Sequence, residues 1–287
     1  MLNLALSILF SSLIFVIFKL FAIYRVQTLF GIIVNYVVAC VVGLLFFDGS
    51  IELSEIPEKS WFPASLLLGA LFIVVFNLMA MTSQKMGVSV ASVATKMSLA
   101  IPVLFGVALY NEHLGPLKIA GIVLALAAVY FSSVKESKIE FKKKELVLPL
   151  LVFLGSGIID SSLKFLEETR VPQQEFPLFS ATIFAAAAVT GIVFILLRSV
   201  SIPLRVNTRN LLGGCALGIP NFFSIYYILK ALQNEVLNSA SVFTVNNVAI
   251  VMLTTLLGIV LFREKISVLN WSGIAMAVIS IFLVALF

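Results

Sequence analysis

The sequence predicts an all-α integral membrane protein with ten transmembrane helices, arranged as two inverted five-helix repeats. The first observation behind this prediction is composition: 61% of the 287 residues are hydrophobic and only 11% are charged. The second is a mean hydropathy of +1.14. Water-soluble domains carry about 25% charged residues, so the low charge content of this chain indicates a membrane protein. The third observation, an internal repeat, predicts the two halves.

Apolar runs follow one another along the whole chain. A helix that crosses about 30 Å of hydrocarbon needs roughly 20 apolar residues, whereas a barrel strand needs about half that number. The runs have helical length, so we expect helices rather than strands. The predicted spans are residues 2–21, 28–47, 61–82, 88–109, 115–134, 146–165, 175–197, 209–230, 238–261 and 267–286.

One pattern occurs in the fourth span and again in the ninth. Residues 91–123 and 240–275 both open with Ala-Ser-Val, and both close a long apolar run with a short turn. Each copy has a glutamate in the turn and a glycine nine residues later: Glu112 and Gly121 in the first copy, Glu264 and Gly273 in the second. A duplicated pair of membrane helices is typical of transporters that consist of two related halves.

The repeat divides the chain into a first half, residues 1–134, a basic connecting loop, residues 135–145, and a second half, residues 146–287. Lys164 near the end of the sixth span matches Lys19 near the end of the first. Because five spans precede the second half, that half enters the membrane from the opposite side. The repeat is therefore inverted, which favours alternating access around a site near the middle of the membrane.

Basic residues are distributed unevenly between the two faces of the predicted bundle. The face formed by connections 1–2, 3–4, 5–6, 7–8 and 9–10, here called the cationic face, carries 13 of the 19 Lys and Arg residues, and the opposite face carries 5. The 13 residues are Lys19, Arg25, Lys85, Lys135, Lys138, Lys142, Lys143, Lys144, Arg198, Arg205, Arg209, Arg263 and Lys265. The positive-inside rule places this face in the cytoplasm and both termini outside.

The chain resembles the ten-helix EamA branch of the drug/metabolite transporter superfamily. The resemblance is carried by the lysine that closes the first span, by the stretch from Pro102 to Glu112 with Gly121 after it, and by the related stretch Leu261–Lys265 with Gly273. It covers almost the whole chain and implies export of small solutes such as amino acids, metabolites, nucleotide sugars or drugs. The resemblance also implies cytoplasmic termini, contrary to the charge distribution.

The two copies of the repeat differ where a substrate site is expected. Pro102 in the first copy predicts a kink in the fourth span. Thr254 stands at the matching position of the second copy, so no kink is expected in the ninth span. Lys96 lies near the middle of the fourth span, and the ninth span has Asn246 and Asn247 instead of a charge.

Lys96 is the main candidate for a substrate-binding residue, because a charge in hydrocarbon costs a few kcal/mol. Asp160 in the sixth span is its candidate partner, and such a pair could be opened by an anionic substrate or a proton. Two alternatives remain open. Lys96 could be part of a purely structural ion pair, and Asp160 could pair with Lys164 on its own helix.

Other polar side chains within the spans are further candidates for lining the site. They are Asn77, Asn246, Asn247, Tyr226, Lys19 and Lys164. Interfacial snorkelling would equally explain the two lysines, and packing between helices would explain the amides. Glu112 and Glu264 are each expected to cap the helix that follows, and Gly214 and Gly218 predict close helix packing.

We therefore expect a secondary-active transporter, an exporter of small metabolites such as amino acids or organic anions, rather than an enzyme. The alternatives are a lipid or lipid-phosphate translocase of the same fold and, more remotely, an intramembrane enzyme. The expected partners are a small-molecule substrate and the lipid bilayer, with coupling to a proton or a counter-substrate left open. No cofactor, metal or nucleic acid is expected. The expected location is a bacterial inner (plasma) membrane, as a monomer or homodimer.

Overall fold

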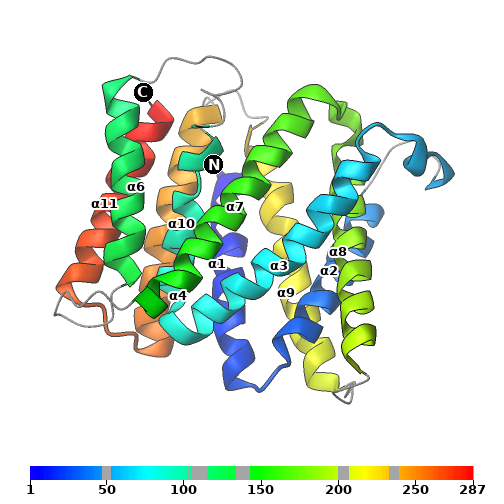
Figure 1. Cartoon of the computed structure of the whole chain (residues 1–287), viewed down its shortest axis with the longest axis horizontal. Coiled ribbons are helices and arrows are strands. Elements are labelled where there is room, and N and C mark those ends of the chain that lie inside the picture. Colours follow the sequence, from blue (N-terminus) through cyan, green and yellow to red (C-terminus); the bar gives the residue numbers. More distant parts are fainter. Residues whose placement is uncertain are drawn as a thin grey trace.

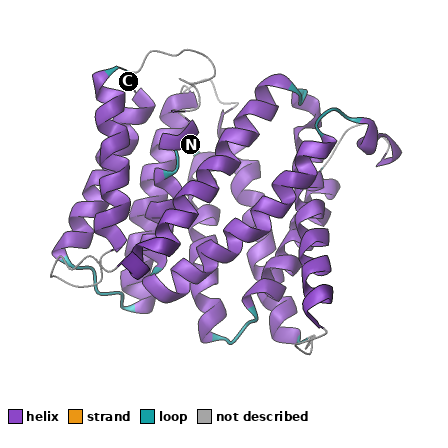
Figure 2. Cartoon of the chain, in the orientation of Figure 1, coloured by secondary structure: helices purple, strands orange, loops and turns teal. Residues whose placement is uncertain are grey.

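The computed structural model describes residues 1–46, 53–102, 104, 115–133, 143–199, 207–232 and 239–286. These residues form ten long helices and two short 3-10 turns, without a strand (Figure 2). The long helices are α1 (Leu2–Ile23), α2 (Thr28–Leu45), α3 (Phe62–Met86), α4 (Val88–Met97), α6 (Pro116–Ser133), α7 (Lys143–Thr169), α8 (Phe176–Ser199), α9 (Thr208–Leu232), α10 (Ser239–Phe262) and α11 (Val268–Leu286). The 3-10 turns are η1 (Leu53–Glu58) and η2 (Gln173–Glu175).

Each predicted span overlaps one of these helices, so the all-α membrane fold is confirmed. Within the described ranges, seven helices are long and apolar enough to cross a membrane, and shorter apolar helices at Val88–Pro102, Ile119–Ser132 and Val268–Val284 fill the other predicted spans. The predicted connecting loop, 135–145, is too long: helix α7 begins at Lys143. The rest of that loop lies outside the described residues.

Several of the most extensive helix contacts are retained when the two halves are exchanged. Helix α1 packs against α9 and α10, as its counterpart α7 packs against α3 and α4. Helix α2 packs against α9, as α8 packs against α3, and the pairs α2–α8, α4–α10 and α6–α11 each join a helix to its own counterpart. Both termini lie at the same end of the bundle (Figure 1). This is the arrangement that an inverted repeat predicts.

The repeated glycines allow α6 and α11 to approach closely. A Cβ atom on Gly121 would come within 2.7 Å of Val284, and one on Gly273 within 2.5 Å of the backbone nitrogen of Ser132. Ser280 Oγ donates a hydrogen bond to Gly121 O at 2.7 Å. The two copies of the repeat thus meet one another at symmetry-related positions, which explains why each keeps a glycine there.

Helix α9 lies equally close to α2. A Cβ atom on Gly218 would come within 2.8 Å of Asn35 O, and one on Gly214 within 2.8 Å of Gly31 O. The close packing predicted from these glycines therefore occurs within the chain.

Polar contacts fasten α2 to α9 and α3 to α8. At the cationic face, Asn210 Oδ1 accepts a hydrogen bond from the Gln27 backbone N–H at 2.9 Å, and Asn210 Nδ2 donates to Gln27 Oε1 at 3.2 Å. At the opposite end, Glu175 accepts hydrogen bonds from Trp61 Nε1 at 2.7 Å and Lys59 Nζ at 2.9 Å. We call these contacts the α2–α9 clamp and the α3–α8 clamp. They join symmetry-related pairs of helices at related ends.

The fourth span, predicted for residues 88–109 with a kink from Pro102, is interrupted rather than only kinked. Helix α4 ends at Met97, a turn follows at Ser98 and Leu99, and helix resumes at residues 100–102. Pro102 explains the break, because proline lacks the N–H that would bond to the carbonyl four residues earlier, that of Ser98. The Ile101 N–H donates to Ser98 O instead, at 2.8 Å. Helix α10, with Thr254 at the matching position, is continuous as expected. Residues 105–109 lie outside the described ranges.

Candidate functional site

Lys96 and Asp160 lie on either side of the contact between α4 and α7. Lys96 is in the last turn of α4 and is half-buried, and Asp160 on α7 is exposed. Ser98, in the break just after α4, donates a hydrogen bond from Oγ to Asp160 Oδ2 at 3.1 Å. The break therefore brings a hydroxyl group, a lysine and an aspartate into one neighbourhood.

The predicted pairing of Lys96 with Asp160 is electrostatic, without direct contact. The two charges interact, but Nζ and the carboxylate oxygens are more than 4.0 Å apart. Among the described residues, the Lys96 ammonium has no hydrogen-bond or ion-pair partner. A charge held in the bundle without direct neutralisation is favourably placed to bind an ion of opposite sign.

Glycines on α7 explain why this helix comes so close to α4. A Cβ atom on Gly157 would collide with Ile101, which follows the break, and one on Gly155 would lie 2.7 Å from Val75 on α3. Asp160 is one helical turn beyond Gly157, so it faces the same side. The sequence Gly155-Ser156-Gly157 is thus a packing surface that positions the aspartate.

Asn246 and Asn247 face different neighbours. Asn246 Oδ1 accepts a hydrogen bond from Ser7 Oγ of α1 at 3.2 Å, which ties this amide into helix packing. Asn247 is 9% exposed, and its side chain has no hydrogen-bond partner among the described residues.

Asn247 lies on the face of α10 that meets α4. Thr254, two turns farther along α10, contacts Ser92 of α4 with 2.6 Å between their Oγ atoms. Lys96 is one turn beyond Ser92 on α4. Because the two helices run in opposite directions, Lys96 and Asn247 lie on facing sides and toward the same end of the bundle.

The described contacts of Tyr226 and Asn77 are with residues other than Lys96 and Asp160. Tyr226 stacks with Phe222 of its own helix at 5.7 Å, meets Phe46 of α2 at 5.2 Å, and has Lys230 Nζ above its ring at 4.5 Å. Asn77 donates a hydrogen bond to Ile73 O of its own helix at 2.8 Å, which leaves its Oδ1 without a partner among the described residues. The structure therefore places Tyr226 in an aromatic cluster between α9 and α2.

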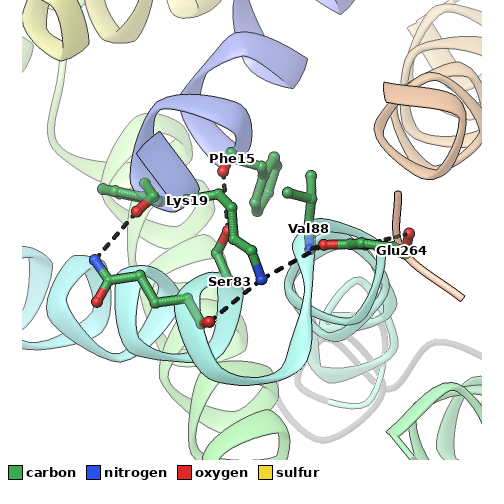
Figure 3. A network of polar contacts seen from close by, with 8 residues as sticks. Phe15, Lys19, Ser83, Val88 and Glu264 are labelled. Atoms are coloured by element: carbon green, nitrogen blue, oxygen red, sulfur yellow. Dashed lines mark hydrogen bonds and ion pairs between the residues drawn. The ribbon is translucent and has the colours of Figure 1, made fainter. Parts of the chain in front are cut away.

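The side chain of Lys164 and the whole of Glu112 lie outside what the structure describes, so the alternative pairing of Asp160 with Lys164 stays a prediction. Lys19 is described, and its Nζ forms an ion pair with Glu264 Oε1 at 3.7 Å (Figure 3).

Glu264 does not cap the helix that follows it, contrary to the sequence-based expectation. Ser267 and Asn270 cap α11: the Asn270 N–H donates to Ser267 Oγ, and the Ser267 N–H donates to Asn270 Oδ1, both at 3.1 Å. Glu264 instead accepts a hydrogen bond from the Val88 N–H at 2.9 Å and so caps α4 in the other half of the molecule. The neighbouring Ser-x-x-Asn pattern already supplied the cap for α11.

Sequence reasoning missed Ser98, and Pro102 was the signal that could have identified it. A proline frees the carbonyl four residues earlier, and serine side chains are among the groups that help to satisfy freed backbone in membrane helices. Contacts between the halves, such as Ser92 with Thr254, gave no such signal.

Comparison with known proteins agrees with this architecture. Residues 1–134 match the EamA-like transporter family. An uncharacterized protein of Haemophilus influenzae (strain ATCC 51907 / DSM 11121 / KW20 / Rd) is 32% identical over 225 residues, which cover 77% of this chain and 74% of the relative. A protein of known crystal structure shares the fold, with a TM-score of 0.61 and 18% identity over 98% of this chain and 96% of that one. The chain belongs to the EamA-like transporter family of multi-pass membrane proteins.

Proposed function

We propose that the protein is a secondary-active exporter of small metabolites such as amino acids or organic anions. The observation that carries this proposal is the Lys96 ammonium, which is half-buried beside a helix break and has no direct partner among the described residues. A carboxylate or phosphate group of a substrate would supply the missing partner. Asp160, at longer range, would then receive an ammonium group or a proton.

The break in α4 supports a site at this place. Irregular backbone within a membrane is tolerated where it is buried in protein or lines a polar path, and interrupted helices near the midplane form the binding sites of several transporter folds. Asn247, on the facing side of α10, adds an amide without a partner among the described residues. The site thus draws residues from both halves of the repeat.

A lipid or lipid-phosphate translocase is the second candidate. It is favoured by the exposure of Asp160, which would attract a head-group ammonium while Lys96 attracts the phosphate and an acyl tail stays in the bilayer. We further propose that the cationic face lies in the cytoplasm of a bacterial cell, in the inner membrane. A cytoplasm-only reporter fused to Phe287 would then give no signal, and a signal would reverse this orientation.

Counterflow in proteoliposomes tests the function. Metabolites exported by cells with and without the protein are compared first, and the solute with the largest difference is used as the labelled probe. We expect saturable counterflow that falls at least about tenfold in Lys96→Met and Asp160→Asn, since each removes a charge from the site. Lys59→Met is the matched control, because it removes a lysine from the α3–α8 clamp.

The same vesicles decide between the candidates. Movement of a fluorescent phospholipid without solute counterflow would establish the translocase instead. Full counterflow in both Lys96→Met and Asp160→Asn would remove this site from the mechanism.

A further inference from the structure

The side chain of Glu264 joins three helices from both halves of the chain at the cationic face. Its Oε1 atom lies 3.7 Å from Lys19 Nζ at the end of α1 and 2.9 Å from the Val88 nitrogen at the start of α4 (Figure 3). A carboxylate is stabilised both by a cation and by the N-terminus of a helix. Glu264 receives both interactions although it follows α10 in the sequence.

Two glycines make room for this carboxylate. A Cβ atom on Gly87 would lie 2.9 Å from Glu264 Oε2, and one on Gly258 would lie 2.6 Å from it. Gly87 has a φ of 118°, a backbone conformation that other residues rarely adopt. The carboxylate therefore sits in a socket formed by the start of α4 and the last turns of α10.

The backbone conformation at the end of α10 directs the Glu264 side chain into this socket. Arg263 has a φ of 52°, which is uncommon for a residue with a side chain. The Glu264 N–H donates a hydrogen bond to Gly258 O at 3.1 Å, so the chain folds back over the end of α10. The position of the carboxylate is thus built into the backbone.

Helix α1 is also fastened to α3 at this end. Lys19 Nζ donates to Gln84 O at 3.3 Å, Ser83 Oγ donates to Phe15 O at 2.9 Å, and Gln84 Nε2 donates to Phe18 O at 3.1 Å. Four helices, α1, α3, α4 and α10, are therefore joined at the cationic face by polar contacts.

The described helices pack differently at the opposite end of the bundle. Exchanging the halves would require α7 to pack against α9 and α10, as α1 packs against α3 and α4. Among the described residues, α7 lacks comparable packing against either helix. In a transporter with two related gates, contacts that are present at one end and lacking at the other belong to one conformational state.

We propose that Lys19 and Glu264 form a latch that holds the cationic face closed, and that α4 couples this latch to the substrate site. Helix α4 has ten residues, about 15 Å of rigid rod. Glu264 binds its N-terminus, and Lys96 is in its last turn. A substrate that attracts the Lys96 ammonium would shift α4. Because Val88 at the start of α4 bonds to Glu264, this shift would also displace the latch. This inference rests on the proposed function.

Three variants separate the parts of the latch. Glu264→Gln keeps an oxygen that can accept from Val88 and loses the attraction to Lys19, whereas Glu264→Ala loses both. Gly258→Val leaves the charges unchanged and fills the socket. The control is the double variant Lys59→Met, Glu175→Gln, which removes an ion pair at the other end of the bundle. The side chains of that pair are 26% and 13% exposed, close to the 22% and 12% of Lys19 and Glu264.

Pulsed electron–electron double resonance, which measures distances between spin labels, reports whether the cationic face opens. The labels are placed at Tyr24→Cys and Lys265→Cys, both exposed positions, after Cys40 and Cys215 are changed to Ala, and the protein is held in lipid nanodiscs. We expect the short distance to dominate in the parent protein. Glu264→Gln should raise the ratio of long to short distances about fivefold, and Glu264→Ala and Gly258→Val at least as much. The control variant should leave the ratio unchanged.

Identical distance distributions in all the variants would overturn the latch. A rise in the control variant equal to that in Glu264→Gln would also overturn it, because the effect would then be general loosening. Counterflow measured on the same proteins keeps the two proposals apart. If counterflow is normal and the distances do not respond, the latch alone fails, and if the distances respond without any counterflow, the proposed function fails.

Discussion

The two clamps and the Lys19–Glu264 latch lie between helices whose packing differs in symmetry among the described residues. The α2–α9 clamp has a counterpart in the α3–α8 clamp, so the contact between these helices is present in both halves. The packing of α1 on α3 and α4 lacks a comparable counterpart among the described residues of α7, α9 and α10. Contacts that repeat belong to a fixed scaffold, and contacts that do not repeat mark the part that changes.

The scaffold and the latch also differ in the kind of contact that holds their helices together. The scaffold combines its clamps with glycine and alanine surfaces that bring backbones together, and such packing cannot loosen without leaving voids. The latch combines a partly exposed ion pair with a single helix cap. Partly exposed ion pairs contribute little net stability. The Lys59–Glu175 pair of the α3–α8 clamp is equally exposed, so the close backbone packing, and not the ion pair, distinguishes the scaffold from the latch.

The largest predicted effect comes from a change in the scaffold packing. Gly69 on α3 faces α8, and a Cβ atom there would lie 2.5 Å from Ala186 Cβ and 2.7 Å from the Ala187 nitrogen. Gly69→Val should therefore lower the free energy of unfolding by about 3 kcal/mol or more, measured as loss of monodisperse protein and a lower Tm in detergent. Gly115→Ala is the control, because a Cβ atom there meets nothing within 4 Å. Equal stability of the two variants would contradict the scaffold assignment.

A smaller effect is expected from breaking either clamp. Asn210→Ala removes two hydrogen bonds from Gln27, and Trp61→Phe removes the indole donor from Glu175. Each change should cost about 1–2 kcal/mol, seen as a lower Tm, without changing the distance across the cationic face. If one of them opened that face as Glu264→Ala is expected to do, the distinction between clamp and latch would be lost.

The smallest effect is a pH dependence of the α3–α8 clamp. Partial burial alone would raise the pKa of the Glu175 carboxyl, but hydrogen bonds from Trp61 and Lys59 outweigh burial and leave the pKa below its usual 4.5. Because the folded-state pKa is lowered, the stabilisation is present above pH 4.5 and is lost as the pH falls through the folded value. The Tm of the parent protein should therefore fall relative to that of Glu175→Gln below pH 4.5, by about 1–2 °C. Parallel pH curves would show that the clamp is uncharged or unformed.

Most of the fold could be predicted because the solvent imposes it. Helices in lipid need long apolar runs, and these are visible in one sequence without knowledge of their neighbours. The repeat predicted two related halves, whereas the close approach of α6 and α11 at Gly121 and Gly273 was seen only in the structure. The kink expected from Pro102 is present as a break in the fourth span, but the end of α4 at Met97 was not predicted.

The candidate site could be predicted only in part, because its contacts join residues far apart in the sequence. Lys96 and Asp160 were identifiable as charges within apolar runs, and the structure places them close enough to interact. That they bind a substrate stays a prediction. The cap that Glu264 provides for α4 was not identifiable, since capping patterns are local and this one reaches from residue 264 to residue 88. Whether Asn246 and Tyr226 touch a substrate stays a prediction.

Hydrogen–deuterium exchange of Glu264→Gln against the parent protein, both in nanodiscs, tests the division into scaffold and latch most directly. We predict faster exchange, by about fivefold, in the end of α1 (residues 18–24) and the first turn of α4 (residues 88–92). Exchange should stay unchanged in the clamp segments of α2 (residues 27–34) and α9 (residues 208–214). Unchanged exchange at α4, or faster exchange in the clamp segments to the same degree, would contradict the account.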